Sequence, residues 1–281
     1  MPVLSPLLRR GKGEALEILI MTILDEINNH KRTEIAEAKS RVSLEELKES
    51  PYFKRKINSL KAALLAEGAS GVIAEFKTKS PSKGVINDSA EVSEVTESYV
   101  TAGASGLSVL TDNYFFGGSF EDLAKARWAN PNTPILRKDF MLDLYQIYEA
   151  RAHGADVILL IAESLSKSLL LELTQTAKEI GLEVLVEVHS SEELEKLNPQ
   201  VDLVGVNNRN LKTFEVDIQT SVILSHLIPE QFVKISESGI SDPESISQLR
   251  VAGFKGFLIG EIFMKTDNPG KACAEFIEKL K

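Results

Sequence analysis

Short apolar runs and amphipathic helical patterns alternate along most of this chain. Most of the apolar runs end in a charged or polar residue just before a loop. Between them, residues 145–153, 167–180 and 243–252 repeat apolar positions at helical spacing. This alternation predicts a parallel sheet covered by helices. The eight predicted strands span residues 73–77, 106–110, 134–137, 156–161, 183–186, 203–206, 232–235 and 256–259.

Eight strand and helix units within residues 71–281 fit a (β/α)8 barrel, a fold of about 250 residues. In such barrels the functional side chains gather at the carboxyl ends of the strands, where nearly every predicted strand here has its charge or amide. An open doubly wound sheet is the alternative, commonly with a glycine-rich first turn. No G-x-G-x-x-G turn is present in the chain. We therefore predict the α/β class and a TIM barrel.

A helical region precedes the predicted barrel. Residues 23–39 and 56–65 set apolar side chains on one helical face among charges. We expect residues 21–70 to form a helical extension packed on the barrel domain of residues 71–281, where it either caps the barrel or covers its mouth.

The first twenty residues differ from the rest. Arg9 and Arg10 with a short apolar run faintly imitate a targeting signal, but acidic residues such as Glu14 interrupt any apolar core. No apolar stretch is long enough to span a bilayer. Our hypothesis is that Met21 opens the folded protein and that residues 1–20 are an upstream extension.

Composition excludes several classes of protein. With 281 residues, 43% of them hydrophobic, the chain can bury one large core, and its net charge of −9 disfavours a nucleic-acid partner. A single cysteine, Cys273, excludes an internal disulfide and fits a reducing compartment. The four histidines are scattered without zinc-site spacing. We expect a cytoplasmic protein with no metal and no membrane partner.

Charged side chains on the predicted strands gather where a barrel places its functional groups. Period-2 alternation puts Glu75 and Lys77 on one face, although an edge strand with a surface ion pair gives the same pattern. Lys77 and Lys138 can both face the mouth, where two nearby ammonium groups lower at least one lysine pKa and suit general-acid work. Glu187 then supplies the base, and Glu75 or Glu237 orients the lysines. An ordinary ion-pair network is the alternative for each.

Small residues after the last two strands suggest an anion site. Ser238 and Gly239 follow the seventh strand and Gly260 follows the eighth, so backbone N–H groups can approach a phosphate there. Arg209 adds a charged fork to the same anion. Both glycines also suit tight turns that hold no ligand.

Six sequence blocks together resemble the indole-3-glycerol phosphate synthase family. Their order and spacing agree with that family, and ILDEI at 23–27 resembles its usual start, so the resemblance covers residues 21–281. The blocks are AEFK at 74–77 with SPSKG at 80–84, FFGGS at 115–119, LRKDF at 136–140, VEVH at 186–189, GVNNRNL at 205–211 and SESGI at 236–240.

The resemblance implies a carboxy-lyase of tryptophan biosynthesis that closes, decarboxylates and dehydrates 1-(2-carboxyphenylamino)-1-deoxyribulose 5-phosphate without a cofactor. Lys138 would protonate the ribulose carbonyl as the aromatic carbon attacks it, and Glu187 would be the acid and base of the dehydration. Lys77 would hold the anthranilate carboxylate and share the proton transfers. Three further side chains would orient substrate and lysines: Glu75, Asn207 and Glu237.

The resemblance also implies where the two ends of the substrate lie. The phosphate-side contacts would be Ser80, Arg209, Ser238, Gly239 and Gly260, and the apolar surroundings of the ring would be Phe116, Phe140 and Leu211. One departure stands out, because the family usually has a small residue after Gly260-Glu261 and this chain has Ile262-Phe263. A hydroxyl contact from that position is therefore absent, and backbone donors would serve.

Two other functions compete with this interpretation. A phosphoribosylanthranilate isomerase would place a catalytic cysteine at the end of the first strand, where this chain has Glu75 and Lys77. A non-catalytic phosphate-binding barrel would need the anion site but not Lys138 and Glu187 together. We expect a phosphorylated small molecule as substrate and a monomer, or at most a weak homo-oligomer.

Overall fold

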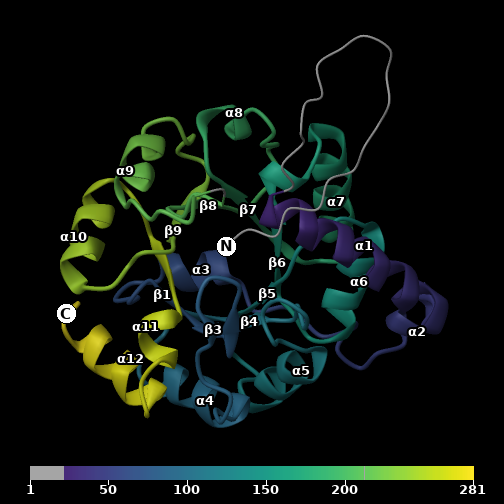
Figure 1. The fold of residues 1–281 in the computed structure, drawn as a ribbon, viewed down its shortest axis with the longest axis horizontal. Coiled ribbons are helices and arrows are strands. Elements are labelled where there is room, and N and C mark those ends of the chain that lie inside the picture. The colour runs from purple at the N-terminus through teal and green to yellow at the C-terminus, as the bar shows by residue number, and fades with distance from the viewer. Residues whose placement is uncertain (1–21, 212) are drawn as a thin grey trace.

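The computed structural model describes residues 22–211 and 213–281. In this part of the chain, eight parallel strands pair in the closed order β1-β10-β9-β8-β7-β6-β5-β4, inside a ring of helices (Figure 1). The predicted barrel is therefore confirmed. Its strands are β1 (Val72–Phe76), β4 (Gly106–Leu110), β5 (Ile135–Lys138), β6 (Val157–Ile161), β7 (Glu183–Val188), β8 (Leu203–Asn207), β9 (Val233–Glu237) and β10 (Gly256–Ile259).

Helices follow the strands, and polar side chains cap several of their first turns. The hydroxyl of Ser166 accepts a hydrogen bond from the Leu169 N–H, and Asp242 accepts one from the N–H of Ser245. A small hairpin of β2 (Lys79–Ser80) and β3 (Gly84–Val85) follows β1. The outer helices are α4 (Val92–Thr101), α5 (Phe120–Ala129), α6 (Leu144–Ala152), α7 (Lys167–Glu179), α8 (Ser191–Leu194), α9 (Gln219–Ser225), α10 (Pro243–Val251), α11 (Glu261–Met264) and α12 (Pro269–Glu278), with a 3-10 turn η1 (Ala162–Ser164) after β6.

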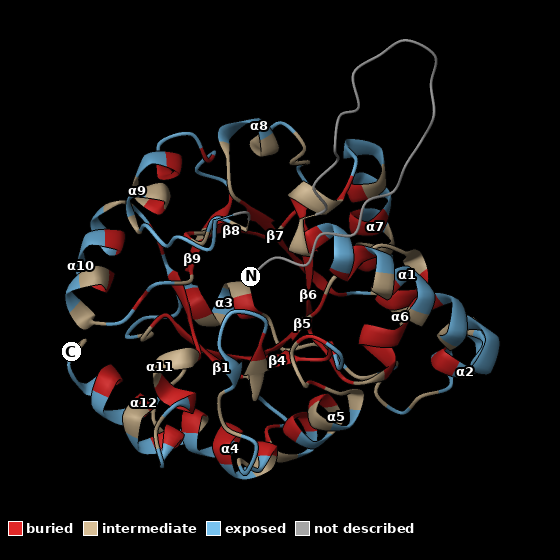
Figure 2. Ribbon diagram, viewed as in Figure 1, coloured by how far each residue is buried: buried red, intermediate tan, exposed pale blue. Residues whose placement is uncertain are grey.

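The strands are buried on both faces, as the red strands of Figure 2 show. Ile73 and Leu258 pack inside the barrel, whereas Val72 and Ala74 pack outward against the helices. Burial on both faces explains why the strands appear in the sequence as nearly continuous apolar runs. A charged residue that points inward, such as Glu75, is therefore shielded from water except at the mouth.

Three helices precede the barrel: α1 (Ile23–Arg41), α2 (Leu44–Lys48) and α3 (Leu60–Leu65). Helix α3 closes the amino-terminal end of the barrel. A methyl group on Gly106 would lie 2.6 Å from Leu60, and one on Gly256 would lie 3.1 Å from Leu64. Glu183, at the start of β7, accepts a hydrogen bond of 2.8 Å from the N–H of Leu60. The glycines at the strand ends thus leave room for the side chains of α3, and Glu183 accepts a hydrogen bond from its first turn.

Helix α1 lies at the opposite end, against the loops that follow β4, β5 and β6. Its Lys31 is buried and contacts Asp112 at 2.8 Å and Asp139 at 3.0 Å. The amide of Asn28 donates a hydrogen bond of 3.0 Å to Ser164. These polar contacts hold α1 at the edge of the mouth.

Some predicted boundaries differ from the structure. The helix predicted over 56–65 begins only at Leu60, because the Ser59 hydroxyl caps it by accepting from the N–H of Ala62. The short helix α2 was not predicted. The hypothesis about residues 1–20 and Met21 lies outside the described residues. In the part of the chain that the structure describes, no helix has the length and apolar character of a membrane span.

Candidate active site

A cavity of about 710 Å³ opens at the carboxyl ends of the barrel strands. Its size is that of a small-molecule site. All of the candidate site residues line it, and each of the six sequence blocks contributes at least one of them. They are Glu75, Lys77, Ser80, Phe116, Lys138, Phe140, Glu187, Asn207, Arg209, Leu211, Glu237, Ser238, Gly239 and Gly260.

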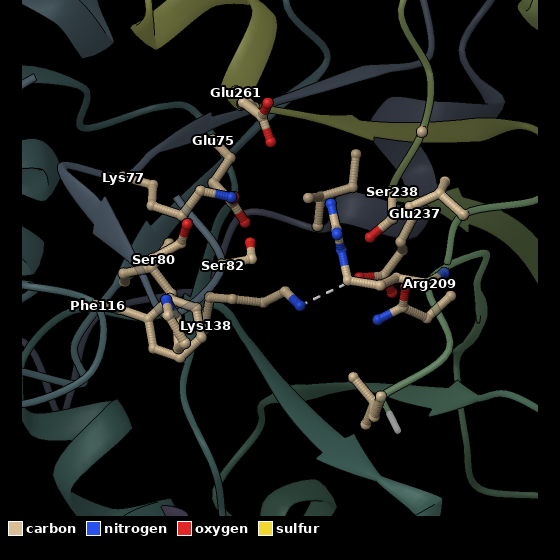
Figure 3. A pocket seen from close by; sticks show the side chains of 18 of the residues that line it. Glu75, Lys77, Ser80, Ser82, Phe116, Lys138, Arg209, Glu237, Ser238 and Glu261 are labelled. Atoms are coloured by element: carbon tan, nitrogen blue, oxygen red, sulfur yellow. Dashed lines mark hydrogen bonds and ion pairs between the residues drawn. The ribbon is translucent and has the colours of Figure 1, made fainter. Parts of the chain in front are cut away.

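Lys138 ends β5 and lies among carboxylates on the floor of the cavity. Its Nζ is 3.1 Å from Glu187 Oε2 and 3.2 Å from Glu237 Oε2, and Figure 3 shows the side chain reaching across the cavity toward Glu237. Burial alone would lower the pKa of Lys138, but the charges of Glu187, Glu237 and Glu75 outweigh it and raise that pKa. The lowering of a lysine pKa that the sequence suggested for at least one of the two lysines therefore does not occur at Lys138. Lys77, which also lines the cavity, pairs with Glu75 Oε1 at 2.8 Å.

Both oxygens of the Glu187 carboxylate are held. Oε2 faces Lys138, and Oε1 accepts a hydrogen bond of 3.0 Å from the Asn207 amide on β8. Burial would raise the pKa of Glu187, but the positive charges of Lys138 and His189 bring it down to about 2. Glu187 is therefore ionised at neutral pH.

Glu237 has the opposite balance. Burial raises the pKa of its carboxyl to about 7, with help from the nearby charges of Glu187 and Glu75, although Lys138 opposes the rise. Its carboxylate fits because position 205 on the neighbouring strand β8 is glycine, where any Cβ would overlap Glu237 Oε1. Two acidic side chains that flank one lysine thus have pKa values pushed apart.

The remaining sides of the cavity divide into an apolar and a polar part. The rings of Phe116 and Phe140 lie 5.8 Å apart between centroids, tilted by 35°. From α1, Ile23, Leu24 and Ile27 also line the cavity. The site prediction did not include these three, although two of them, Ile23 and Ile27, belong to the apolar helical face that the sequence pattern indicates.

Backbone geometry at the end of β9 suits an anion. Ser238 and Gly239 are consecutive residues in the left-handed region, with φ of 66° and 76°. Successive residues of this kind can turn N–H groups toward one point. Lys83 of the β2–β3 hairpin also lines the cavity and lies 3.8 Å from Glu261, a cation that the site prediction did not include. Ile262 lines the cavity without offering a hydroxyl.

His189 is another residue that the site prediction left without a role. Its Nε2 lies 3.4 Å from Glu187 Oε1. The signal was present in the sequence, because period-2 alternation along β7 sends residues 187 and 189 to the same side. Among the described residues, metal-type ligand atoms of Glu163, His189 and Glu193 come within 4.8 Å of one another.

Comparisons with known proteins point to one family. A family model described as Indole-3-glycerol phosphate synthase matches residues 24–276. A relative of that name from Bacteroides thetaiotaomicron is 49% identical over 259 residues, which are 92% of this chain and 99% of its own. Another, from Salinibacter ruber, is 45% identical over 90% of this chain and 94% of its own.

Two solved structures share the fold. A tryptophan synthase subunit alpha from Legionella pneumophila has a TM-score of 0.58 at 13% identity, over 80% of this chain and 97% of its own. A 3-hexulose-6-phosphate synthase from Salmonella typhimurium has a TM-score of 0.59 at 11% identity, over 75% of this chain and 100% of its own. At such low identity, these likenesses concern the barrel alone.

Proposed function

The chain belongs to the indole-3-glycerol phosphate synthase family, and from that premise we propose that Lys138 and Glu187 carry the proton transfers of its reaction. The enzyme is a carboxy-lyase of tryptophan biosynthesis. It converts 1-(2-carboxyphenylamino)-1-deoxyribulose 5-phosphate to indole-3-glycerol phosphate, carbon dioxide and water. The observation that carries the assignment is the ammonium group of Lys138 held between Glu187 and Glu237.

Lys138 acts first, as general acid in ring closure. When the aromatic carbon that bears the carboxylate attacks the ribulose carbonyl, negative charge develops on the carbonyl oxygen. The ammonium group of Lys138 at that oxygen stabilises the charge and transfers a proton to it. The carboxylate then leaves as carbon dioxide, and its bonding electrons restore the aromatic ring.

Glu187 acts in the dehydration. The new hydroxyl leaves as water after it takes a proton, and a proton leaves the neighbouring carbon to complete the indole. The ionised carboxylate of Glu187, close to Lys138, can accept that proton and pass it on. Asn207 holds the carboxylate in place, while Glu75 and Glu237 hold the two lysines.

The two ends of the substrate bind on different sides of the cavity. Lys77 takes the anthranilate carboxylate, and the ring lies against Phe116, Phe140 and Leu211. The phosphate lies at Ser80, Arg209, Ser238, Gly239 and Gly260, where backbone N–H groups replace the hydroxyl that Ile262 lacks.

The test is to follow indole fluorescence after substrate is added, without metal or nucleotide. Lys138→Ala should lower kcat by at least about 10²-fold and leave substrate binding largely intact, because a general acid contributes at least that factor. Glu187→Gln should also abolish turnover. Lys125→Ala, which removes an exposed lysine that pairs with Glu121 on α5, is the matched control and should be unchanged.

Three outcomes would count against the proposal. Near-normal turnover in Lys138→Ala would remove that residue from its role. Binding without turnover in the unaltered protein would support a non-catalytic phosphate-binding barrel. Loss of turnover on treatment with a chelator would show that the reaction needs a metal.

We also propose that the enzyme is a cytoplasmic monomer, because one chain supplies all the residues assigned to the site. Light scattering should give the mass of a single chain, and cell fractionation should recover the protein with the cytoplasm. We further propose that residues 21–70 serve the barrel of residues 71–281 as a packed extension. A chain that begins at Met21 should then keep its stability and activity.

A further inference from the structure

The imidazole of His189 lies between two carboxylates, one of which, Glu187, lines the cavity. Its Nε2 is 3.4 Å from Glu187 Oε1, and its Nδ1 is 3.6 Å from Glu193 Oε2. The side chain is only 11% exposed. Glu193 Oε2 also accepts a hydrogen bond of 2.9 Å from the backbone N–H of His189, which fixes the carboxylate beside the ring.

This arrangement favours the doubly protonated ring. A neutral imidazole has one N–H and one lone pair, so one of its nitrogens would turn a lone pair toward a carboxylate. The imidazolium ion instead places its positive charge beside both carboxylates. Neither ring nitrogen has a hydrogen-bond partner within the described part of the chain, so the two charge contacts decide the protonation state.

The charges around the ring point the same way. The ionisable groups that face it are Glu187 from β7, Glu193 from α8 and Glu163 from η1, and all three are acidic. Burial lowers the pKa of His189, but these carboxylates outweigh burial and raise it.

We propose that His189, as an imidazolium ion, is a positioning residue that holds Glu187 Oε1 and keeps Glu187 anionic for the dehydration. Oε1 is then held from two sides, by His189 and by Asn207, while Oε2 faces Lys138. The inference rests on the proposed role of Glu187. It assigns His189 no contact with the substrate.

A dependence on pH follows. Below its raised pKa, His189 is charged and Glu187 is held; as the pH rises through that value, the charge and the contact are lost. The enzyme should therefore lose activity on the alkaline side at the pKa of His189. Lys138 does not account for that loss, because its own pKa is raised. Glu237, with a pKa of about 7, also titrates in this range, and substitution of His189 separates the two titrations.

The experiment combines two substitutions with a titration that needs no turnover. His189→Gln keeps an N–H near the position of Nε2 but removes the charge and the titration, and Glu193→Gln removes one neighbouring charge while its amide oxygen can still accept from the backbone. Because the chain has only four histidines, NMR titration of labelled imidazoles can follow His189, with His189→Gln identifying its signal.

We expect the NMR pKa of His189 to lie above that of an ordinary histidine and to fall in Glu193→Gln. His189→Gln should lower kcat about tenfold at neutral pH, the effect of losing one charge-assisted contact, with little change in KM. The alkaline loss of activity should disappear in His189→Gln and move to lower pH in Glu193→Gln. A residue that only packs would change stability and leave the pH profile in place.

A neutral His189 at pH 7, or a pKa that Glu193→Gln leaves unchanged, would overturn the inference. An unaltered pH profile in His189→Gln would overturn it as well. If His189→Gln fails to fold, sequence-specific assignment of the labelled protein identifies the His189 signal, and titration of the unaltered protein and of Glu193→Gln still decides the matter. Failure of the proposed function is distinguishable, because it would appear as an inactive unaltered enzyme or as an active Glu187→Gln variant.

Discussion

Replacement of Lys31 by Met should lower the free energy of unfolding by about 3 kcal/mol. Lys31 is 3% exposed and contacts Asp112 and Asp139 at 2.8 and 3.0 Å. Burial opposes its charge, but the carboxylates outweigh burial and raise the pKa of Lys31. The substitution therefore removes a full positive charge from between buried carboxylates.

The magnitude follows from what remains after the substitution. Met keeps most of the apolar stem of Lys31, so the loss is mainly electrostatic. Asp139 keeps its ion pair with Arg137 at 2.9 Å, whereas the described contacts leave the Asp112 side chain a backbone N–H from Phe115. Removal of one partner of a buried pair costs roughly 3 to 5 kcal/mol. We take the lower end because one of the two carboxylates retains a cation.

Lys39→Met is the matched control. It makes the same change on the same helix, and Lys39 also pairs with an aspartate, Asp143, at 2.7 Å. Its side chain is 46% exposed, so its loss should lower the unfolding free energy by only about 0 to 1 kcal/mol. The two variants differ mainly in the burial of the ion pair.

Urea unfolding followed by circular dichroism measures both variants. The KM of Lys31→Met should also rise, because α1 brings Ile23, Leu24 and Ile27 to the cavity. Equal losses of stability in Lys31→Met and Lys39→Met would refute the reasoning, since burial would then not decide the strength of the pair. A normal KM in a destabilised Lys31→Met would show that α1 keeps its place without the ion pair.

Three more outcomes can be checked. Gly205→Ala should lower stability by roughly 1 to 3 kcal/mol in urea unfolding and reduce kcat, because its methyl group displaces Glu237; unchanged kinetics would contradict the assigned contact. Glu237 holds its proton more tightly when folded, so its contribution makes stability fall as the pH rises from 4.5 through about 7, and Glu237→Gln should flatten that part of the stability profile. Trp128, the single tryptophan, is 81% exposed, so its emission maximum should shift little on unfolding; a large red shift would mean that it is buried in solution.

The barrel was predictable because its strands are buried on both faces and therefore stand out as apolar runs. Position along the strand also predicted that Glu75 and Lys138 face the mouth, since alternation and strand ends are local properties. The pKa of Lys138 was not predictable in this way. Its carboxylate neighbours, Glu187 and Glu237, come from β7 and β9, and only closure of the sheet brings them to it.

Lys31 and α2 illustrate two further limits. Lys31 lies in a helix rich in charge, and nothing local distinguishes it from the exposed Lys39; its burial comes from loops that follow β4 and β5. Helix α2 has five residues, too few for an apolar period, and depends on a capping box between Ser43 and Glu46. His189, in contrast, could have been predicted from the sequence. The period-2 alternation that directs Glu187 toward the site directs His189 to the same side.

Helix α3 closes the amino-terminal end of the barrel, and this has a consequence for how the chain folds during synthesis. Leu60 and Leu64 emerge from the ribosome before any strand that they will contact. Leu64 finds its place against Gly256 only when β10, the last strand, has been made. The same strand closes the sheet by pairing with β1. Packing of α3 against the amino-terminal end of the barrel and closure of the sheet therefore both depend on the synthesis of β10. Until then, the core into which Leu60 and Leu64 pack is incomplete.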